Sequence, residues 1–268
     1  MNIVITTCQT YPDLPDNLRP LQRLLEARGD VVQIAPWQQC PSADLILPFC
    51  AWDYAAYPDQ FARWLTQPGN RFPNGGGLMR WNMHKSYLVD LAARGADVIP
   101  TQILPADADV LRRALAQYPQ GCVMKPAIGQ SGGHVMRLLP DDALPDLQPY
   151  QRGVVMQPFV ADVLTQGETS LIFFNGEYSH AVHRRPPPQE WRANSAYGVQ
   201  IFPAKPSVDI VRAAENVLRL LPQMPVYARV DGTISDERFL INEVELIEPA
   251  LYLHQCAGAV ERLVAVIE

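Results

Sequence analysis

Three acidic residues near the end of the chain are the strongest candidates for chemistry. Glu243 and Glu245 lie two residues apart in an apolar run, and Asp231 lies in an earlier apolar run that can pair with it. Alternate side chains of a strand share a face, so a hairpin of these two runs would gather the three carboxylates. Such a cluster needs a neutralising cation, and an all-oxygen set favours Mg²⁺ or Mn²⁺ over zinc. The alternative is an exposed acidic face that Arg229 neutralises.

Two lysines and a glycine-rich turn have the composition of a polyphosphate site. Lys125 ends an apolar run, and the segment 129–133, Gly-Gln-Ser-Gly-Gly, follows it. Backbone N–H groups of such a turn can bind phosphate oxygens, and the lysine adds a point charge. The spacing matches neither the Walker A loop nor the dinucleotide fingerprint, so a surface hairpin with a glycine turn is the alternative. For Lys85 the alternative is an exposed lysine near a helix start.

A segment rich in arginine and proline has the composition of a loop over a binding site. Arg184 and Arg192 flank three consecutive prolines, 186–188, and Gly198 follows them. Arginine is suited to the bidentate capture of a carboxylate or a phosphate. The alternative for this segment is a polar surface loop.

The elements that must position these residues follow from the apolar periodicity. Apolar strands at 3–5, 31–34 and 44–49 alternate with helices at 16–29 and 58–65. This order predicts a parallel sheet with helices packed on it.

Beyond residue 80 the pattern changes to a mixture of helices and mostly hairpin-connected strands. Asn175-Gly176 is the strongest hairpin signal in the chain, and a second hairpin is expected with its turn at 232–238. The remaining predicted helices are 82–95, 107–117, 207–221 and 255–267, and the remaining strands are 122–126, 134–139, 154–157, 169–174, 177–183, 226–231 and 239–245. The predicted fold class is therefore α/β, of the α+β kind.

The composition excludes several functions. The 268 residues are 48% hydrophobic and 19% charged, as in a compact soluble protein. The net charge is −6 without any run of Lys or Arg, which argues against a nucleic-acid or membrane partner. The N-terminal segment reads as a strand and not as a signal peptide, and no apolar stretch is long enough to span a bilayer. Five scattered cysteines fit a reducing cytoplasm.

Taken in this order, the motifs resemble the ATP-grasp superfamily. The most specific similarity lies between residues 123 and 245, and the branch is that of glutathione synthetase and the ribosomal-protein glutamate ligase. Residues 51–101, with Trp52-Asp53-Tyr54 and Trp81-Asn82, look like the cyclo-ligase group of D-cycloserine biosynthesis. The resemblance implies the ATP-grasp fold with an N-terminal βαβ pre-ATP-grasp domain at 1–80, a small central lobe at 81–160 and a C-terminal lobe with the metal site at 161–268, the last two gripping ATP.

The resemblance also implies a role for each matching position. Those expected to contact ATP are Lys85 and Lys125 at the phosphates, Ser131, Gly132 and Gly133 over them, Gln157, Pro158, Phe159 and Val160 as the adenine-reading hinge, and Glu168 at the ribose. Those expected to act in catalysis are Arg184, Arg192 and Arg229; those expected to bind Mg²⁺ or Mn²⁺ are Asp231, Glu243 and Glu245; substrate candidates are Asp53, Tyr54, Asn194 and Gly198. The glutamate-ligase branch has Asn where Glu245 stands, so either Glu245 binds metal or only Asp231 and Glu243 do.

The implied function is an ATP-dependent carboxylate–amine ligase. A substrate carboxylate would become an acyl phosphate, and an amine would then displace phosphate from it. The similarity favours a small amino-acid-like substrate and, by family habit, a homodimer. Two alternatives stay open, a small-molecule phosphotransferase on the same fold and a nucleotide-binding protein without turnover.

Overall fold

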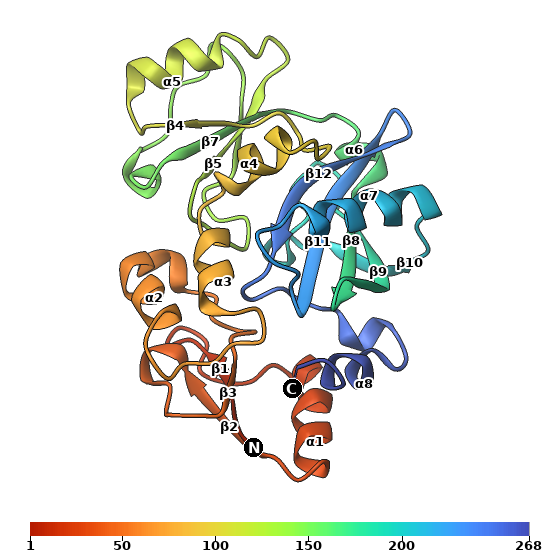
Figure 1. Ribbon diagram of the computed structural model, residues 1–268. Coiled ribbons are helices and arrows are strands. Elements are labelled where there is room, and N and C mark those ends of the chain that lie inside the picture. Colours follow the sequence, from red (N-terminus) through yellow and green to blue (C-terminus); the bar gives the residue numbers. More distant parts are fainter. Residues whose placement is uncertain (268) are drawn as a thin grey trace.

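The computed structural model describes residues 1–267, which form three sheets (Figure 1). The first sheet is parallel in the order β2-β1-β3, built from β1 (Asn2–Thr7), β2 (Val31–Pro36) and β3 (Leu45–Leu47). Helix α1 (Arg19–Ala27) joins β1 to β2, and α2 (Pro58–Leu65) follows β3. The predicted βαβ arrangement of the first lobe is confirmed.

The second sheet is antiparallel, in the order β4-β7-β5-β6. Its apolar face packs on α5 through buried side chains that include Leu111 and Met156. The elements are β4 (Gln102–Leu104), α5 (Ala108–Leu115), β5 (Cys122–Pro126), β6 (Met136–Leu138) and β7 (Val154–Pro158). The sequence did not predict β4, which is only three residues long and half-buried.

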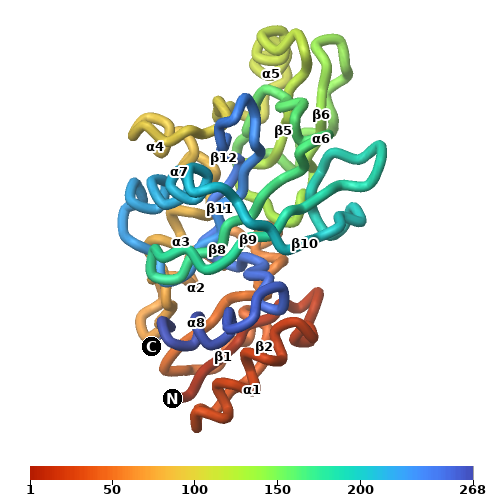
Figure 2. Tube along the Cα trace, turned by 90° about the vertical axis from the view of Figure 1, so that its right-hand side faces the viewer, coloured from red at the N-terminus to blue at the C-terminus, as the bar shows by residue number. Residues whose placement is uncertain are grey.

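The third sheet is antiparallel in the order β10-β9-β8-β11-β12. Its strands are β8 (Glu168–Phe174), β9 (Glu177–Arg185), β10 (Gln200–Ala204), β11 (Tyr227–Ser235) and β12 (Arg238–Glu245), and its helices are α6 (Val163–Gln166), α7 (Val208–Arg219) and α8 (Ala259–Val264). Helix α7 covers one face, while α8 reaches back to pack against α1 of the first lobe (Figures 1 and 2). Strand β10 was not predicted.

Two hairpin turns test the sequence reading directly. The turn Asn175-Gly176 is confirmed, with φ of 49° and 78°, the positive values that a tight hairpin requires. The second turn was predicted too long. It consists of Asp236 and Glu237, at φ of 48° and 63°, and the strands continue to Ser235 and from Arg238.

The helix predicted at 82–95 is confirmed only over its second part, and its predicted start is wrong. Helix α3 (Gly76–Asn82) ends where that helix was expected to begin, and α4 (Tyr87–Ala93) starts after a turn. In the turn, the backbone N–H of Lys85 donates to Ala127 O at 2.8 Å. Ala127 lies between the end of β5 and the glycine-rich loop 129–135. The bond to Ala127 O therefore interrupts the helix and places Lys85 beside that loop.

Two buried asparagines attach α3 to the third sheet. Asn74 Oδ1 accepts from the N–H groups of Val226 and Tyr227, and its Nδ2 donates to Tyr227 O and Leu246 O. The Asn82 side chain bonds to the backbone of β12 and of the residue after it. Its Nδ2 donates to Val244 O, and its Oδ1 accepts from the N–H of Leu246. The Asn82 side chain thus satisfies backbone groups at the outer edge of β12, and that of Asn74 joins the start of β11 to the segment after β12.

Replacing Asn74 with alanine is expected to lower the free energy of unfolding by about 3 kcal/mol, because four buried backbone groups lose their partner. Denaturant unfolding followed by circular dichroism measures this. The exposed Asn216 on α7 provides the matched control, and its alanine variant should stay within about 0.5 kcal/mol. Equal stabilities of the two variants would contradict the role given to Asn74.

Among residues 1–267 no helix combines the length and the apolar character that crossing a bilayer demands. All five cysteines are free thiols.

Candidate active site

A cleft lies between the second and third sheets and gathers most of the predicted site residues. Its lining includes Lys85, Lys125, Ser131, Gly132, Gly133, Gln157, Pro158, Phe159, Val160, Glu168, Arg184, Arg192, Asn194, Asp231, Glu243 and Glu245. These residues come from β5, β7, β8, β9, β11, β12 and four connecting segments. The sequence therefore identified the cleft, although the role of each residue stays a prediction.

The loop 129–135 is held by its carbonyl groups. Lys85 Nζ donates to Gly129 O at 2.7 Å, Tyr197 Oη to Gly132 O at 3.0 Å, and Tyr150 Oη to His134 O at 2.6 Å. Ser131, Gly132 and His134 have positive φ of 55°, 71° and 57°. Within residues 1–267 the N–H groups of Ser131 and Gly132 have no hydrogen-bond partner. A loop with fixed carbonyls and free N–H groups is suited to anion binding.

Gly132 is also the point where two loops meet over the cleft. A Cβ atom there would lie 2.6 Å from Asn194 Oδ1. Only glycine allows this approach together with the positive φ. The loop 129–135 and the loop that carries Asn194 and Tyr197 are therefore closed against each other.

The two lysines are buried on the floor of the cleft. Lys85 is 7% exposed and pairs with Glu243 Oε1 at 2.6 Å. Lys125 is 5% exposed and donates to Asn242 Oδ1 at 3.1 Å. Burial lowers the pKa of Lys125 to about 8, although the Glu243 carboxylate opposes the shift. Among the described residues, Lys125 forms no ion pair with a carboxylate.

This shift predicts a pH-dependent affinity for a polyphosphate. An anion at Lys125 raises the lysine pKa, so binding above about pH 8 must take up a proton and the Kd rises, up to about tenfold per pH unit. Titration calorimetry with Mg·ATP in buffers of different ionisation enthalpy measures both the Kd and the proton uptake. Lys125→Arg, which stays charged, is the control and should lose this pH dependence. An unchanged pH profile in that variant would contradict the prediction.

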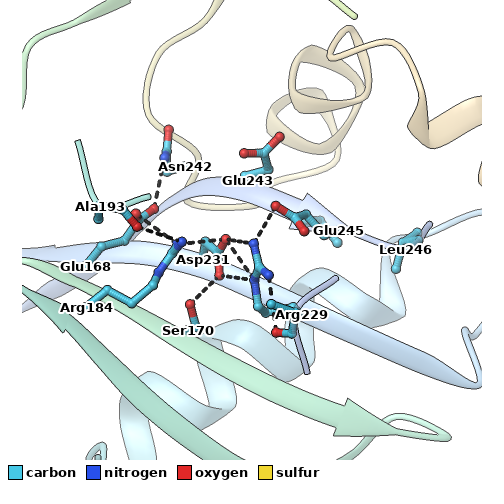
Figure 3. Close-up of polar contacts among 12 residues, drawn as sticks. Glu168, Ser170, Arg184, Ala193, Arg229, Asp231, Asn242, Glu243, Glu245 and Leu246 are labelled. Carbon is cyan, nitrogen blue, oxygen red and sulfur yellow. Dashed lines mark hydrogen bonds and ion pairs between the residues drawn. The ribbon is translucent and has the colours of Figure 1, made fainter. Parts of the chain in front are cut away.

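The acidic residues form an ion-pair network on β8, β9, β11 and β12 (Figure 3). Asp231 accepts from Arg229 Nε and Nη2, both at 2.9 Å, from Arg184 Nη2 at 2.9 Å, and from Ser170 Oγ at 2.7 Å. Burial raises the pKa of Asp231, but the two guanidinium groups outweigh it and hold that pKa below its usual value. Arg184 also pairs with Glu168 at 2.9 Å.

Glu243 and Glu245 lie on the same face of β12 but have different environments. Burial raises the pKa of Glu243, while Lys85 and Lys125 outweigh it and lower the pKa below its usual value. Burial raises the pKa of Glu245 to about 7, and the carboxylates of Glu243 and Asp231 add to the rise, although Arg229, which donates to Glu245, opposes it. The cleft is therefore short of positive charge at Glu245.

The carboxylates of Asp231, Glu243 and Glu245 have the oxygen donors that a divalent cation prefers, although each of them is paired with an Arg or Lys side chain. Within the described part of the chain, no three His, Cys, Asp or Glu side chains are arranged to hold a metal ion. Asp231, Glu243 and Glu245 nevertheless offer only oxygen donors, and Glu243 and Glu245 are 23% and 26% exposed to the cleft. An oxygen-only set of donors suits Mg²⁺. The metal site stays a prediction, with Glu245 and Glu243 as its accessible members and Asp231 buried.

Arg192 is held in place by its own loop. Its Nε and Nη2 donate to the two oxygens of Glu190 at 3.0 and 2.8 Å. Its guanidinium carbon lies 3.7 Å from the centre of the Tyr197 ring. Hydrogen bonds from Arg192 lower the pKa of Glu190 to about 2.

Four predicted site residues lie outside the cleft lining. Arg229 contacts Asp231, Glu245 and Ala250 O, so it positions carboxylates. Asp53 accepts from Trp37 Nε1 at 2.6 Å and Gln38 Nε2 at 2.8 Å. The other two are Tyr54, which is buried against Phe61, and Gly198, which ends a short helical turn at φ 74°.

Several residues of the cleft lining are not among the predicted site residues, and three of them form notable contacts. Asn242 faces the cleft together with Glu243 because a bulge opposite Asp231 and Gly232 breaks the strand alternation. Trp191 contacts Phe159, which is predicted to belong to the hinge, with ring centroids 5.7 Å apart. The third, Gln130, donates to Trp52 O and so links the loop to the first lobe. A bulge leaves no clear sequence signal, whereas Trp191 adjoins the predicted Arg192.

Comparison with known proteins agrees with this geometry. Residues 3–72 match the model of the N-terminal domain of D-cycloserine synthetase DcsG. The cycloserine biosynthesis protein DcsG of Streptomyces lavendulae is 40% identical over 118 residues, 40% of this chain and 40% of that protein. The chain matches less than half the length of each curated relative.

Solved structures extend the similarity to the whole chain. The crystal structure of D-cycloserine synthetase DcsG has a TM-score of 0.85 and 26% identity, over 100% of this chain and 98% of that one. D-alanine–D-alanine ligase from Bacillus anthracis, at 12% identity, shares the fold, with a TM-score of 0.68 over 100% and 97% of the two chains. Residues 90–226, just over half of the chain, match the ATP-grasp domain of prokaryotic glutathione synthetase. The chain belongs to the ATP-grasp ligases of the prokaryotic glutathione synthetase type.

Proposed function

We propose that this protein is an ATP-dependent carboxylate–amine ligase that forms an acyl phosphate on a small amino-acid-like substrate and releases ADP and phosphate. The observation that carries the proposal is the loop 129–135. Within residues 1–267 its N–H groups at Ser131 and Gly132 have no hydrogen-bond partner, and they line the same cleft as Lys125, a buried ammonium that forms no ion pair. This combination is suited to a polyphosphate.

The proposed reaction has two steps that balance. A carboxylate oxygen of the first substrate attacks the γ-phosphorus of ATP, with departure of ADP. An amine then attacks the carbonyl carbon of the acyl phosphate, and inorganic phosphate leaves with the original carboxylate oxygen. Acceleration comes from fixed charges and from positioning.

The residues of the cleft have separate roles in this mechanism. Lys85, Lys125 and the loop N–H groups neutralise and orient the phosphate oxygens, and Arg192 approaches from the closing loop. Asp231 and Glu243 would hold Mg²⁺, with Glu245 as a further donor, and a bound Mg²⁺ adds positive charge at the phosphates. Arg184 and Arg229 keep Asp231 ionised and oriented. The contact of Gly132 with Asn194 closes the cleft and excludes water.

The cellular setting belongs to the same proposal. Free thiols at all five cysteines suit a reducing cytoplasm, where ATP is available. A homodimer, which is the habit of the family, stays a prediction that sedimentation of the purified protein tests.

A phosphate-release screen of amino acids and dipeptides with Mg·ATP tests the proposal. For the first active compound, labelling the carboxylate with ¹⁸O should place one ¹⁸O in the released phosphate, and mass spectrometry should find an amide or a cyclised product. A stable phosphate ester would favour a phosphotransferase instead. Nucleotide binding without phosphate release from any compound would favour a protein without turnover.

A further inference from the structure

An acidic residue outside the cleft lining holds one edge of the Arg192 guanidinium group. Glu190 is not part of the lining, whereas Arg192 is. One oxygen of the Glu190 carboxylate accepts from Arg192 Nε at 3.0 Å, and the other accepts from Arg192 Nη2 at 2.8 Å. These two donors form the side edge of the guanidinium group. A bidentate pair of this kind fixes the orientation of the group as well as its position.

The Glu190 carboxylate is itself held by the backbone of the same loop. Its Oε1 accepts from the N–H groups of Trp191 at 2.8 Å and of Arg192 at 2.9 Å. Hydrogen bonds from the Arg192 side chain lower the pKa of Glu190 to about 2, so the carboxylate is ionised at neutral pH. The Glu190 side chain is only 19% exposed. Glu190 is therefore a fixed anion and not a mobile surface charge.

The aromatic ring beside Arg192 ties the guanidinium group to the loop 129–135. The guanidinium carbon lies 3.7 Å from the centre of the Tyr197 ring. Tyr197 Oη donates to Gly132 O at 3.0 Å, and a Cβ atom at Gly132 would lie 3.0 Å from Tyr197 Cε2. Arg192 is thus held by Glu190 on one edge and by Tyr197 on one face, beside the loop that is suited to anion binding.

Two N–H groups of the Arg192 side chain remain without a partner in the described chain. A guanidinium group has five N–H donors. Glu190 accepts one at Nε and one at Nη2, and Val135 O accepts one at Nη1 at 3.4 Å. The second N–H of each Nη atom is therefore unpaired. Arg192 lines the same cleft as the unpaired N–H groups of Ser131 and Gly132.

We propose that Glu190 is a positioning residue that orients Arg192, so that its two unpaired N–H groups bind oxygens of the γ-phosphoryl group of ATP. By charge alone, Glu190 should oppose the binding of a triphosphate. By geometry it favours binding, because an arginine already held at one edge and one face loses little freedom when it binds an anion. The geometric role fits the structure, since Arg192 lines the cleft while it is paired with Glu190. The inference rests on the proposed function and adds Glu190 to it.

Calorimetric binding of two nucleotides to the intact protein with Mg²⁺ tests this role without a known substrate. The β,γ-imido analogue of ATP carries the γ-phosphoryl group, and ADP lacks it. Glu190→Gln keeps the size of the side chain and one oxygen acceptor. We expect this variant to raise the Kd for the imido analogue about tenfold and to leave the Kd for ADP within about twofold. The exposed Glu177→Gln removes the same charge, and as the matched control it should change neither Kd more than about twofold.

The Arg192→Ala background separates positioning from a structural role in the loop. If Glu190 acts through Arg192, adding Glu190→Gln in that background should change the Kd for the imido analogue by less than about twofold. A variant that disorders the loop would instead lose further affinity, because Trp191 and Asn194 of the same loop also line the cleft.

The outcomes separate this inference from the proposed function. An unchanged or lower Kd for the imido analogue in Glu190→Gln, an equal rise in the Kd for ADP, or a further loss in the Arg192→Ala background would overturn the positioning role. The expected Kd values without phosphate release from any compound would support that role and overturn the ligase reaction. Failure of both nucleotides to bind would overturn both.

Discussion

Replacing Lys125 with alanine is expected to weaken Mg·ATP binding about a hundredfold, equivalent to about 3 kcal/mol. The ammonium is buried, has no close carboxylate, and lies at the start of the loop 129–135, so a polyphosphate would be its principal partner. Calorimetric titration with Mg·ATP at pH 7 measures the change. The free energy of unfolding should be unchanged or should rise, because burial already disfavours the charged lysine.

The exposed Lys205 provides the matched control for that experiment. Lys205→Ala removes the same charge from a position outside the cleft lining. The Kd of this variant for Mg·ATP should stay within about twofold of the unmodified protein's value at 150 mM salt. An equal loss of affinity in the two variants would mean that net charge, and not the Lys125 ammonium, attracts the nucleotide.

Replacing Asp231 with asparagine is expected to lower kcat about a thousandfold and to destabilise the fold by about 3 kcal/mol. The carboxylate is the shared partner of Arg184 and Arg229, so its loss leaves two buried guanidinium groups undercompensated. The same change removes a predicted metal donor. Phosphate release under saturating Mg·ATP and denaturant unfolding measure the two effects.

The two effects can be separated by a second variant and by metal. Ser170→Ala deletes one hydrogen bond to Asp231 but keeps its charge, and we expect a loss of about 1 kcal/mol in stability with kcat within about tenfold. A higher Mg²⁺ requirement of Asp231→Asn would support the metal role. Full activity at the same Mg²⁺ concentration would contradict it.

The sequence predicted the cleft because its residues lie in locally recognisable elements. The βαβ start, the turn Asn175-Gly176 and the hairpin pairing of Asp231 with Glu243 all follow from short-range patterns, and the structure has them. The resemblance to the ATP-grasp superfamily supplied the roles that such patterns do not contain, and the family itself is confirmed.

The missed features depend on contacts between distant segments. The break at Lys85 comes from a bond to Ala127 O, and no glycine or proline marks it. The bulge that turns Asn242 into the cleft comes from the pairing of β11 with β12. The ion pairs of Asp231, Glu243 and Glu245 with Arg and Lys side chains also form only in the folded chain. These pairs hold the three carboxylates apart, so among the described residues they do not form a metal-binding cluster.

A crystal structure with Mg²⁺ and the β,γ-imido analogue of ATP is the most direct test of the central claim, that the cleft grips a metal-bound triphosphate. The account predicts phosphate oxygens at the Lys125 ammonium and at the N–H groups of Ser131 and Gly132, with Mg²⁺ on Asp231 and Glu243. A nucleotide bound elsewhere, or a triphosphate that touches neither Lys125 nor the loop, would contradict it.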